Sequence, residues 1–236
     1  MKRRPPCNAF TLVEMLVVMA IIAILAGIIL ALNGNIQATS ARNRAAAEIR
    51  ALSAACEAYK ADNGGYPQGS PYPGATGTGP TVTDKLDPNP LSSNTFATPD
   101  PNPNDYASLY PVTLFLWQQL SGHLTTIDST QAPTGTNYAG EFFRASVLSG
   151  TKNSNGQVTA VTYILDPFGN PYGYSTAGLY ADQTYRATLL TNGTTSRQGI
   201  IAGYNVTFDM WSTAGATTWP VSAAGTSTTS PWVKNW

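Results

Sequence analysis

Near the start of the chain lies a long apolar run that is unlike any later part of the sequence. Residues 10–32 are almost entirely apolar, and the 18 positions from Met15 to Leu32 hold neither a charge nor a proline. A helix rises about 1.5 Å per residue, so this run would form a helix about 35 Å long, enough to cross a hydrocarbon layer of about 30 Å. The pattern therefore predicts a membrane-spanning helix over residues 10–32.

Beyond residue 32 the apolar positions recur at helical spacing. Four of them are separated by 3, 4 and 3 residues, which places them on one helix face: Ile49, Leu52, Cys56 and Tyr59. The charged residues are assigned to the other faces: Arg42, Arg44, Glu48, Arg50, Glu57 and Lys60. Asn63-Gly64-Gly65 tolerates the left-handed conformation at a helix end. We expect residues 33–65 to be an amphipathic continuation of the first helix.

The remaining residues, 66–236, predict a globular head. Residues 67–111 hold 10 of the 17 prolines without a helical or strand period, which predicts an irregular surface loop. Residues 111–124 have the apolar spacing of a short amphipathic helix. Strands are expected at Val158–Leu165, at Ala187–Thr191 before an Asn192-Gly193 hairpin turn, and at Val206–Trp211. The fold class is α+β, with a long N-terminal α-helix packed on a small antiparallel β-sheet head with long loops.

Composition excludes several classes of function. The 13 basic and 13 acidic residues give a net charge of zero, so we expect no nucleic-acid partner that needs a broad basic surface. One histidine, His123, and two cysteines are too few for a zinc cluster. No phosphate-binding loop, nucleophile elbow or carboxylate pair is evident. We expect a protein that is not an enzyme.

A carboxylate interrupts the start of the apolar run. Glu14 lies inside the predicted span, where an ionisable residue costs several kcal/mol and usually has a function. A secretory signal peptide would have a shorter apolar region and a small-residue cleavage site after it. A plain signal anchor fits the length and the basic residues Lys2 to Arg4, but it does not explain Glu14.

The residues around Glu14 resemble the class III signal of type IV pilins and type II secretion pseudopilins. The segment Ala9-Phe10-Thr11-Leu12-Val13-Glu14 follows a short basic leader, residues 1–9, and precedes the apolar run. The resemblance implies cleavage between Ala9 and Phe10 by prepilin peptidase and N-methylation of Phe10. Ala9 stands where the family usually has Gly. In assembly, Thr11, Leu12, Val13 and above all Glu14 would meet neighbouring copies, with Glu14 facing the Phe10 ammonium of one of them.

Three later segments resemble the major pseudopilin of type II secretion systems, in the family's order. Tyr59 to Pro67 is similar to the helix-end motif, in which Tyr59 and Tyr66 would pack where the helix enters the head. Asp166-Pro167-Phe168-Gly169-Asn170-Pro171-Tyr172 is similar to the turn that introduces a head strand, and its expected motif residues are Asp166, Pro167, Gly169, Asn170 and Tyr172. Phe208 to Ser212 is similar to the last strand.

The resemblance implies a structural subunit of a type II secretion pseudopilus, a filament that helps to export folded proteins. Its partners would be copies of itself, prepilin peptidase, an inner-membrane assembly platform and minor pseudopilins. Its location would be the bacterial inner membrane, with one span and the head in the periplasm. A type IV pilin, a DNA-uptake pseudopilin, and a membrane-anchored periplasmic enzyme or binding protein stay as alternatives.

The family's calcium site is expected to be lost, and no cofactor is expected. Calcium needs 6–8 oxygen ligands, several of them anionic. The chain has no Asp or Glu after Asp209, where the family places the acids of its calcium loop. We therefore predict neither a calcium ion of the family type nor another metal.

Overall fold

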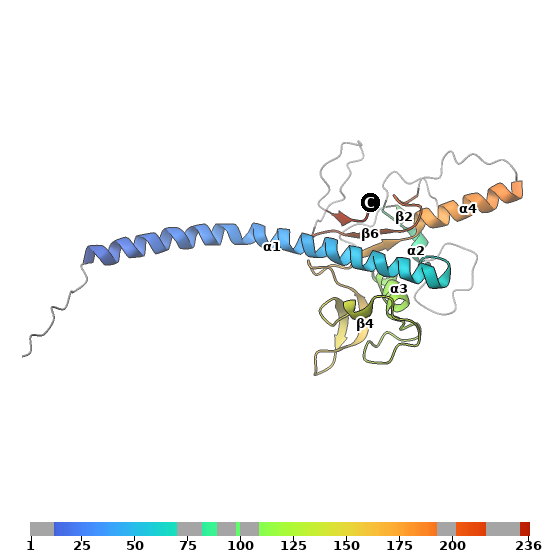
Figure 1. Cartoon of the computed structure of the whole chain (residues 1–236), viewed down its shortest axis with the longest axis horizontal. Helices are drawn as coiled ribbons and strands as arrows, with labels where there is room; N and C mark the ends of the chain where they lie inside the picture. The colour runs from blue at the N-terminus through green and yellow to red at the C-terminus, as the bar shows by residue number, and fades with distance from the viewer. Residues whose placement is uncertain (1–11, 70–81, 89–97, 100–108, 193–201, 216–231) are drawn as a thin grey trace, which may run out of the picture. The chain divides into compact units, whose positions relative to one another are not determined.

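The computed structural model describes the backbone of residues 12–69, 82–88, 98–99, 109–192, 202–215 and 232–236 (Figure 1). Within these ranges it describes all side chains except those of residues 28–36, 98–99 and 192. The chain divides into two compact units, residues 1–41 and residues 42–236, of which the second is called the head unit below.

The long helix is confirmed. Helix α1 runs from Leu12 to Asn63 over 52 residues. It ends where the sequence supplies Gly64, which adopts a φ of +77° and donates its backbone N–H to the carbonyl of Lys60 at 2.8 Å. A left-handed residue directly after the last turn satisfies a helix carbonyl that would otherwise have no partner.

Within the head unit, the core forms between α1 and the helix α3, Leu109–Ser121. The predicted apolar face of α1 is buried, with Leu52 and Cys56 fully inaccessible. It shares the core with Leu116, Trp117 and Leu120 of α3. Helix α3 begins two residues before the predicted Pro111, which still lies in its first turn, where the missing N–H of proline costs no hydrogen bond.

Part of the predicted surface loop is buried. The described residues include the one-turn helix α2, Val82–Lys85, and the parallel pair of short strands β1, Leu86–Asp87, and β2, Thr98–Pro99. Asp84 is buried, and its Oδ1 accepts hydrogen bonds from Gln68 at 2.7 Å and Thr176 at 2.9 Å. The expectation of a solvent-facing loop is therefore wrong at Thr83, Asp84, Leu86 and Asp87.

Two antiparallel sheets complete the head unit. Strand β3, Leu148–Lys152, pairs with β4, Val158–Ile164, which α3 covers and which the β-branched run predicted. The 3-10 helix η2, Gly140–Phe142, precedes this hairpin. The second sheet has the order β5, Gly173–Ser175, then β6, Asp209–Ser212, then β7, Val233–Lys234.

The second sheet depends on one close approach. A Cβ atom at Gly173 would lie 2.0 Å from Cε2 of the Trp211 ring, so no larger residue fits there beside that ring. The two residues are direct partners in the register between β5 and β6. The absence of a side chain at residue 173 lets the fully buried indole pack across the strand.

The strand predicted at Ala187–Thr191 is wrong. These residues belong to helix α4, Ala177–Asn192. The β-branched threonines are accommodated because their hydroxyls donate back along the helix, from Thr188 to the Thr184 carbonyl at 2.8 Å and from Thr191 to the Ala187 carbonyl at 2.9 Å. Asn192-Gly193 reads as a hairpin turn in sequence, but Asn192 is the last residue of the helix. The α+β class with small antiparallel sheets is confirmed.

Candidate functional site

The assembly residues that the structure describes lie in the first turn of α1. Leu12 is 81% exposed and Val13 is 67% exposed, and Glu14 is exposed beside them. A carboxylate in the first turn is favoured by the positive end of the helix dipole. Ala9, Phe10 and Thr11, the remaining processing and assembly residues, lie outside the described part of the chain.

The first turns of α1 expose large apolar side chains in every direction. Nine further positions follow this pattern up to residue 25, among them Met15, Leu16, Met19, Ile24 and Leu25. A soluble monomer rarely exposes so extended an apolar surface, which marks a site of contact with protein or lipid.

No helix within the described residues combines the length and the apolar character expected of a membrane span. The span predicted for residues 10–32 includes residues and side chains outside the described ones, and it stays a prediction.

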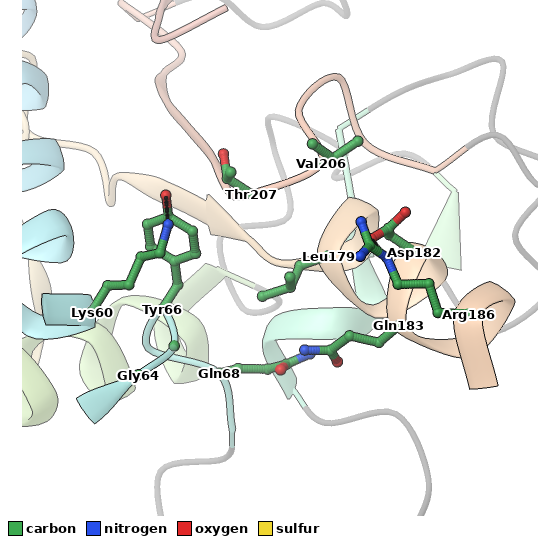
Figure 2. A pocket seen from close by; sticks show the side chains of 11 residues that line it. Lys60, Gly64, Tyr66, Gln68, Leu179, Asp182, Gln183, Arg186, Val206 and Thr207 are labelled. Atoms are coloured by element: carbon green, nitrogen blue, oxygen red, sulfur yellow. Dashed lines mark hydrogen bonds and ion pairs between the residues drawn. The ribbon is translucent and has the colours of Figure 1, made fainter. Parts of the chain in front are cut away.

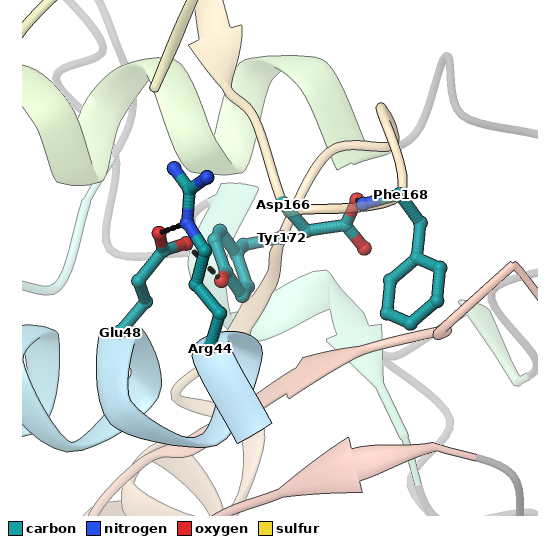
Figure 3. Close-up of polar contacts among 5 residues, drawn as sticks. All are labelled: Arg44, Glu48, Asp166, Phe168 and Tyr172. Atoms are coloured by element: carbon teal, nitrogen blue, oxygen red, sulfur yellow. Dashed lines mark hydrogen bonds and ion pairs between the residues drawn. The ribbon is translucent and has the colours of Figure 1, made fainter. Parts of the chain in front are cut away.

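In the head unit, Glu48 of α1 forms a buried polar contact with the Asp166–Tyr172 turn (Figure 3). The hydroxyl of Tyr172 donates to Oε2 of Glu48 at 2.7 Å, and Nε of Arg44 donates to Oε1 at 2.7 Å. Burial, and then the hydrogen bond to Glu48, raises the pKa of Tyr172 far above its ordinary value. Tyr172 therefore stays a neutral donor. Glu48, which the sequence places off the apolar face of the helix, is nevertheless buried, since only 8% of it is exposed.

The turn itself is organised by Asp166. Its Oδ1 accepts the backbone N–H of Phe168 at 2.9 Å (Figure 3). Oδ1 also accepts the backbone N–H of Asn170 at 2.8 Å, and Oδ2 accepts the Ser212 hydroxyl at 2.6 Å. Gly169 has a φ of +86°, which explains a glycine at this position of the turn. Burial raises the pKa of Asp166 above its ordinary value, while these hydrogen bonds lower it. The carboxylate thus ties the turn to β6.

The two tyrosines predicted to pack at the helix end both contact the head. The hydroxyl of Tyr59 donates to Oε1 of Gln119 on α3 at 3.0 Å, and its ring meets Tyr138 edge-on at 5.3 Å. The ring of Tyr66 meets Phe208 edge-on at 5.0 Å, just before β6. Together these contacts connect the end of α1 and the segment that follows it to α3 and to the second sheet.

A second carboxylate, Asp209, holds the loop that precedes β6. It accepts the backbone N–H of Tyr204 at 2.7 Å, that of Asn205 at 3.0 Å, and the Asn205 side-chain amide at 2.9 Å. The preceding N–H, from Gly203, donates to Asp87 at 2.9 Å. Burial raises the pKa of Asp209 to about 7, the hydrogen bonds oppose this, and the charge of Asp87 adds to it. The backbone N–H groups of three successive residues, 203–205, thus donate hydrogen bonds to the buried carboxyl groups of Asp87 and Asp209.

His123 has a structural environment. Its Nδ1 lies 2.9 Å from the Ser121 hydroxyl, its Nε2 lies 3.0 Å from the Gln131 carbonyl, and its ring stacks on Trp117 at 4.9 Å. Among the described residues, no group of three or more His, Cys, Asp or Glu side chains is arranged to hold a metal ion. Most of the loop after Asp209, on which the calcium prediction rests, lies outside the described residues.

Sequence reasoning missed three of these contacts. Glu48, Asp87 and Asp209 are buried acids whose partners lie far away along the chain or on a loop. The only local signal was the Arg44–Glu48 spacing of four residues, which indicates an ion pair on a helix but not its burial.

Among the comparisons with known proteins, only the one with protein families finds a match, and this match is confined to the N-terminal segment. The prokaryotic N-terminal methylation motif matches residues 4–30, a range that contains Ala9, Phe10 and Glu14. This motif is the signal of the type IV pilin and pseudopilin class, so the protein is type IV pilin-like in this segment and carries the signal for prepilin peptidase. It implies an inner-membrane prepilin with a periplasmic head. No curated protein and no solved structure matches the chain.

Removal of the Glu48 carboxylate will destabilise the head unit. In Glu48→Ala the buried Tyr172 hydroxyl loses its acceptor, which costs about 1–3 kcal/mol. Urea unfolding of the full chain measures this loss, with Glu141→Ala, an exposed acid of η2, as the matched control. A cost equal to that of the control would contradict the role of Glu48. A double-mutant cycle with Tyr172→Phe isolates the pair and should give a coupling of about 1 kcal/mol or more.

Stability will fall as the pH rises through the range set by Asp209. The folded pKa is about 7 and the ordinary value is 3.8, so the folded state keeps a proton that the unfolded chain loses above pH 3.8. The stabilisation is complete below that pH and disappears as the pH reaches about 7, a change of a few kcal/mol. Asp209→Asn should flatten the free energy of unfolding between these values, whereas Asp62→Asn, at an exposed site of α1, should not. An unchanged slope in Asp209→Asn would refute the assignment.

Proposed function

We propose that this protein is a structural subunit of a type II secretion pseudopilus. The observation that carries the proposal is an exposed carboxylate, Glu14, in the first turn of a helix whose following positions are exposed and apolar, all within a prepilin methylation motif. Proteins with this signal are typically structural. The pseudopilin assignment draws its support from the helix-end, turn and last-strand segments of the head.

In this proposal, prepilin peptidase cuts between Ala9 and Phe10 and methylates the new amino terminus. Residues 10–32 hold the subunit in the inner membrane until it polymerises, and the head lies in the periplasm. The apolar helices then leave the lipid and pack together in the filament core. An assembly platform and minor pseudopilins would start and drive this growth.

Glu14 would set the axial position of each new subunit. Inside an apolar bundle, its carboxylate would meet the Phe10 ammonium of a neighbouring copy. Such a buried pair adds little net stability, but loss of one partner leaves an uncompensated charge that costs several kcal/mol. A subunit in the wrong register would therefore be rejected.

A type IV pilin or DNA-uptake pseudopilin is the alternative within the same class. The methylation motif is common to all of these systems and does not separate them. The resemblance of the Asp166 turn to that of the major pseudopilin is the feature that favours secretion. A membrane-anchored periplasmic enzyme or binding protein with this signal is a further alternative, and it would show an activity without residues 1–33.

Processing tests the proposal directly. Intact-mass and N-terminal analysis of the membrane-extracted protein should show a chain that begins at Phe10 and is heavier by one methyl group. In cells without the prepilin peptidase, the chain should keep residues 1–9 and carry no methyl group. A mature protein that retains its leader in the presence of the peptidase would refute the proposal.

Assembly will depend on the Glu14 carboxylate. Glu14→Ala should still be cleaved but should reduce filament formation at least about tenfold, because the buried ammonium of a neighbour would lose its partner. Sedimentation of sheared filaments and cross-linking between subunits measure this loss. Asp62→Ala, which removes an exposed acid at the other end of α1, should assemble as wild type. Assembly of Glu14→Ala at the wild-type level contradicts the role of Glu14.

A further inference from the structure

A cavity of about 380 Å³ lies in the head unit between the end of α1 and α4 (Figure 2). Lys60 and Tyr66 form one wall, Asp182, Gln183 and Arg186 of α4 form the other, and Thr207 lies in the loop before β6. The volume is within the range of about 300–1,000 Å³ typical of small-molecule sites. The assembly and processing residues lie in the other unit, so this cavity is separate from the proposed function.

Both cations that line the cavity already have hydrogen-bonding partners. Nε of Arg186 lies 2.7 Å from Oδ2 of Asp182, four residues earlier on α4. Nζ of Lys60 donates to the Tyr66 hydroxyl at 3.1 Å, and this hydroxyl donates to Glu57 at 2.9 Å. An anionic ligand would have to displace Asp182 from Arg186 or compete with the Tyr66 hydroxyl for Lys60. The cavity therefore does not favour a phosphate or a carboxylate.

The lining also offers hydrogen-bonding groups that are available to a ligand. The side chains of Gln183 and Thr207 make no hydrogen bond to another described residue, and both residues line the cavity. Gln68 donates through its Nε2 to Asp84 at 2.7 Å, which leaves its amide oxygen available. In Figure 2 the Gln68 side chain reaches in from the segment after α1, and Gln183 reaches in from α4. Planar amide, carboxylate and guanidinium groups can bind adjacent hydroxyls in pairs.

Besides the ring of Tyr66, only Leu179 and the exposed Val206 supply apolar side chains to this cavity. A peptide helix or strand would need a longer apolar groove or an open sheet edge. An uncharged ligand with many hydroxyls and a small C–H face matches the lining best. We propose that this cavity binds a neutral oligosaccharide, with Gln183 and Thr207 as its principal hydrogen-bonding residues.

Titration calorimetry of the full chain tests this with chitohexaose as the probe. The protein is kept in lauryldimethylamine oxide, a detergent whose head group carries neither sugar nor phosphate. Wild type is compared with Gln183→Ala/Thr207→Ala and with Gln157→Ala, which removes an exposed glutamine from the turn between β3 and β4. Inorganic phosphate and an acetylated, amidated hexaglycine peptide are titrated in parallel.

Saturable one-to-one binding of chitohexaose by wild type and Gln157→Ala is expected, with a Kd at least about tenfold higher in the double variant. The melting temperature and circular dichroism of the double variant should match those of wild type. Gln183→Ala alone, at an exposed site, repeats the test if the double variant is less stable. Binding of phosphate or peptide instead of the sugar, no saturation with the sugar, or equal affinity in all variants would overturn the proposal.

Discussion

The carboxylate of Glu48 is the point on which the attachment of α1 within the head unit depends. It is buried, and its two oxygens accept hydrogen bonds from Arg44 and Tyr172. A buried carboxylate must keep such partners, because desolvation costs several kcal/mol. A shift of the helix by one residue would rotate the carboxylate by about 100° away from Tyr172. The contact therefore fixes both the rotation and the axial position of residues 42–63 relative to the Asp166–Tyr172 turn.

The elements with local signals could be predicted from the sequence. The long helix follows from an apolar run, an apolar face at helical spacing and a terminal Asn-Gly-Gly, and β4 follows from its β-branched run. Helix α4 could not be predicted, because its threonines favour strands until their hydroxyls bond to the preceding turn. Burial of Thr83, Asp84, Leu86 and Asp87 could not be predicted either, because prolines around them indicate a loop and say nothing about what covers it.

The residues of the candidate site likewise divide into those that the sequence could predict and those that it could not. The processing signal is a contiguous motif and is recognised by the order of its residues. The head contacts are not contiguous: Glu48 and Tyr172 are 124 residues apart, and Asp87 and Asp209 meet on the Gly203–Asn205 loop. A charge on a helix is assigned to solvent unless its distant partner is known. The long-range polar pairs that determine the head therefore required the three-dimensional structure.

The pair Gly173 and Trp211 couples two positions of the second sheet. The indole occupies the space that a side chain at residue 173 would need, since the nearest ring atom lies 2.0 Å from the place of a Cβ. A larger residue at 173 is compatible with this sheet only if residue 211 becomes smaller at the same time. Related chains should consequently change both positions together, and a chimaera that exchanges one strand without the other should lose the sheet.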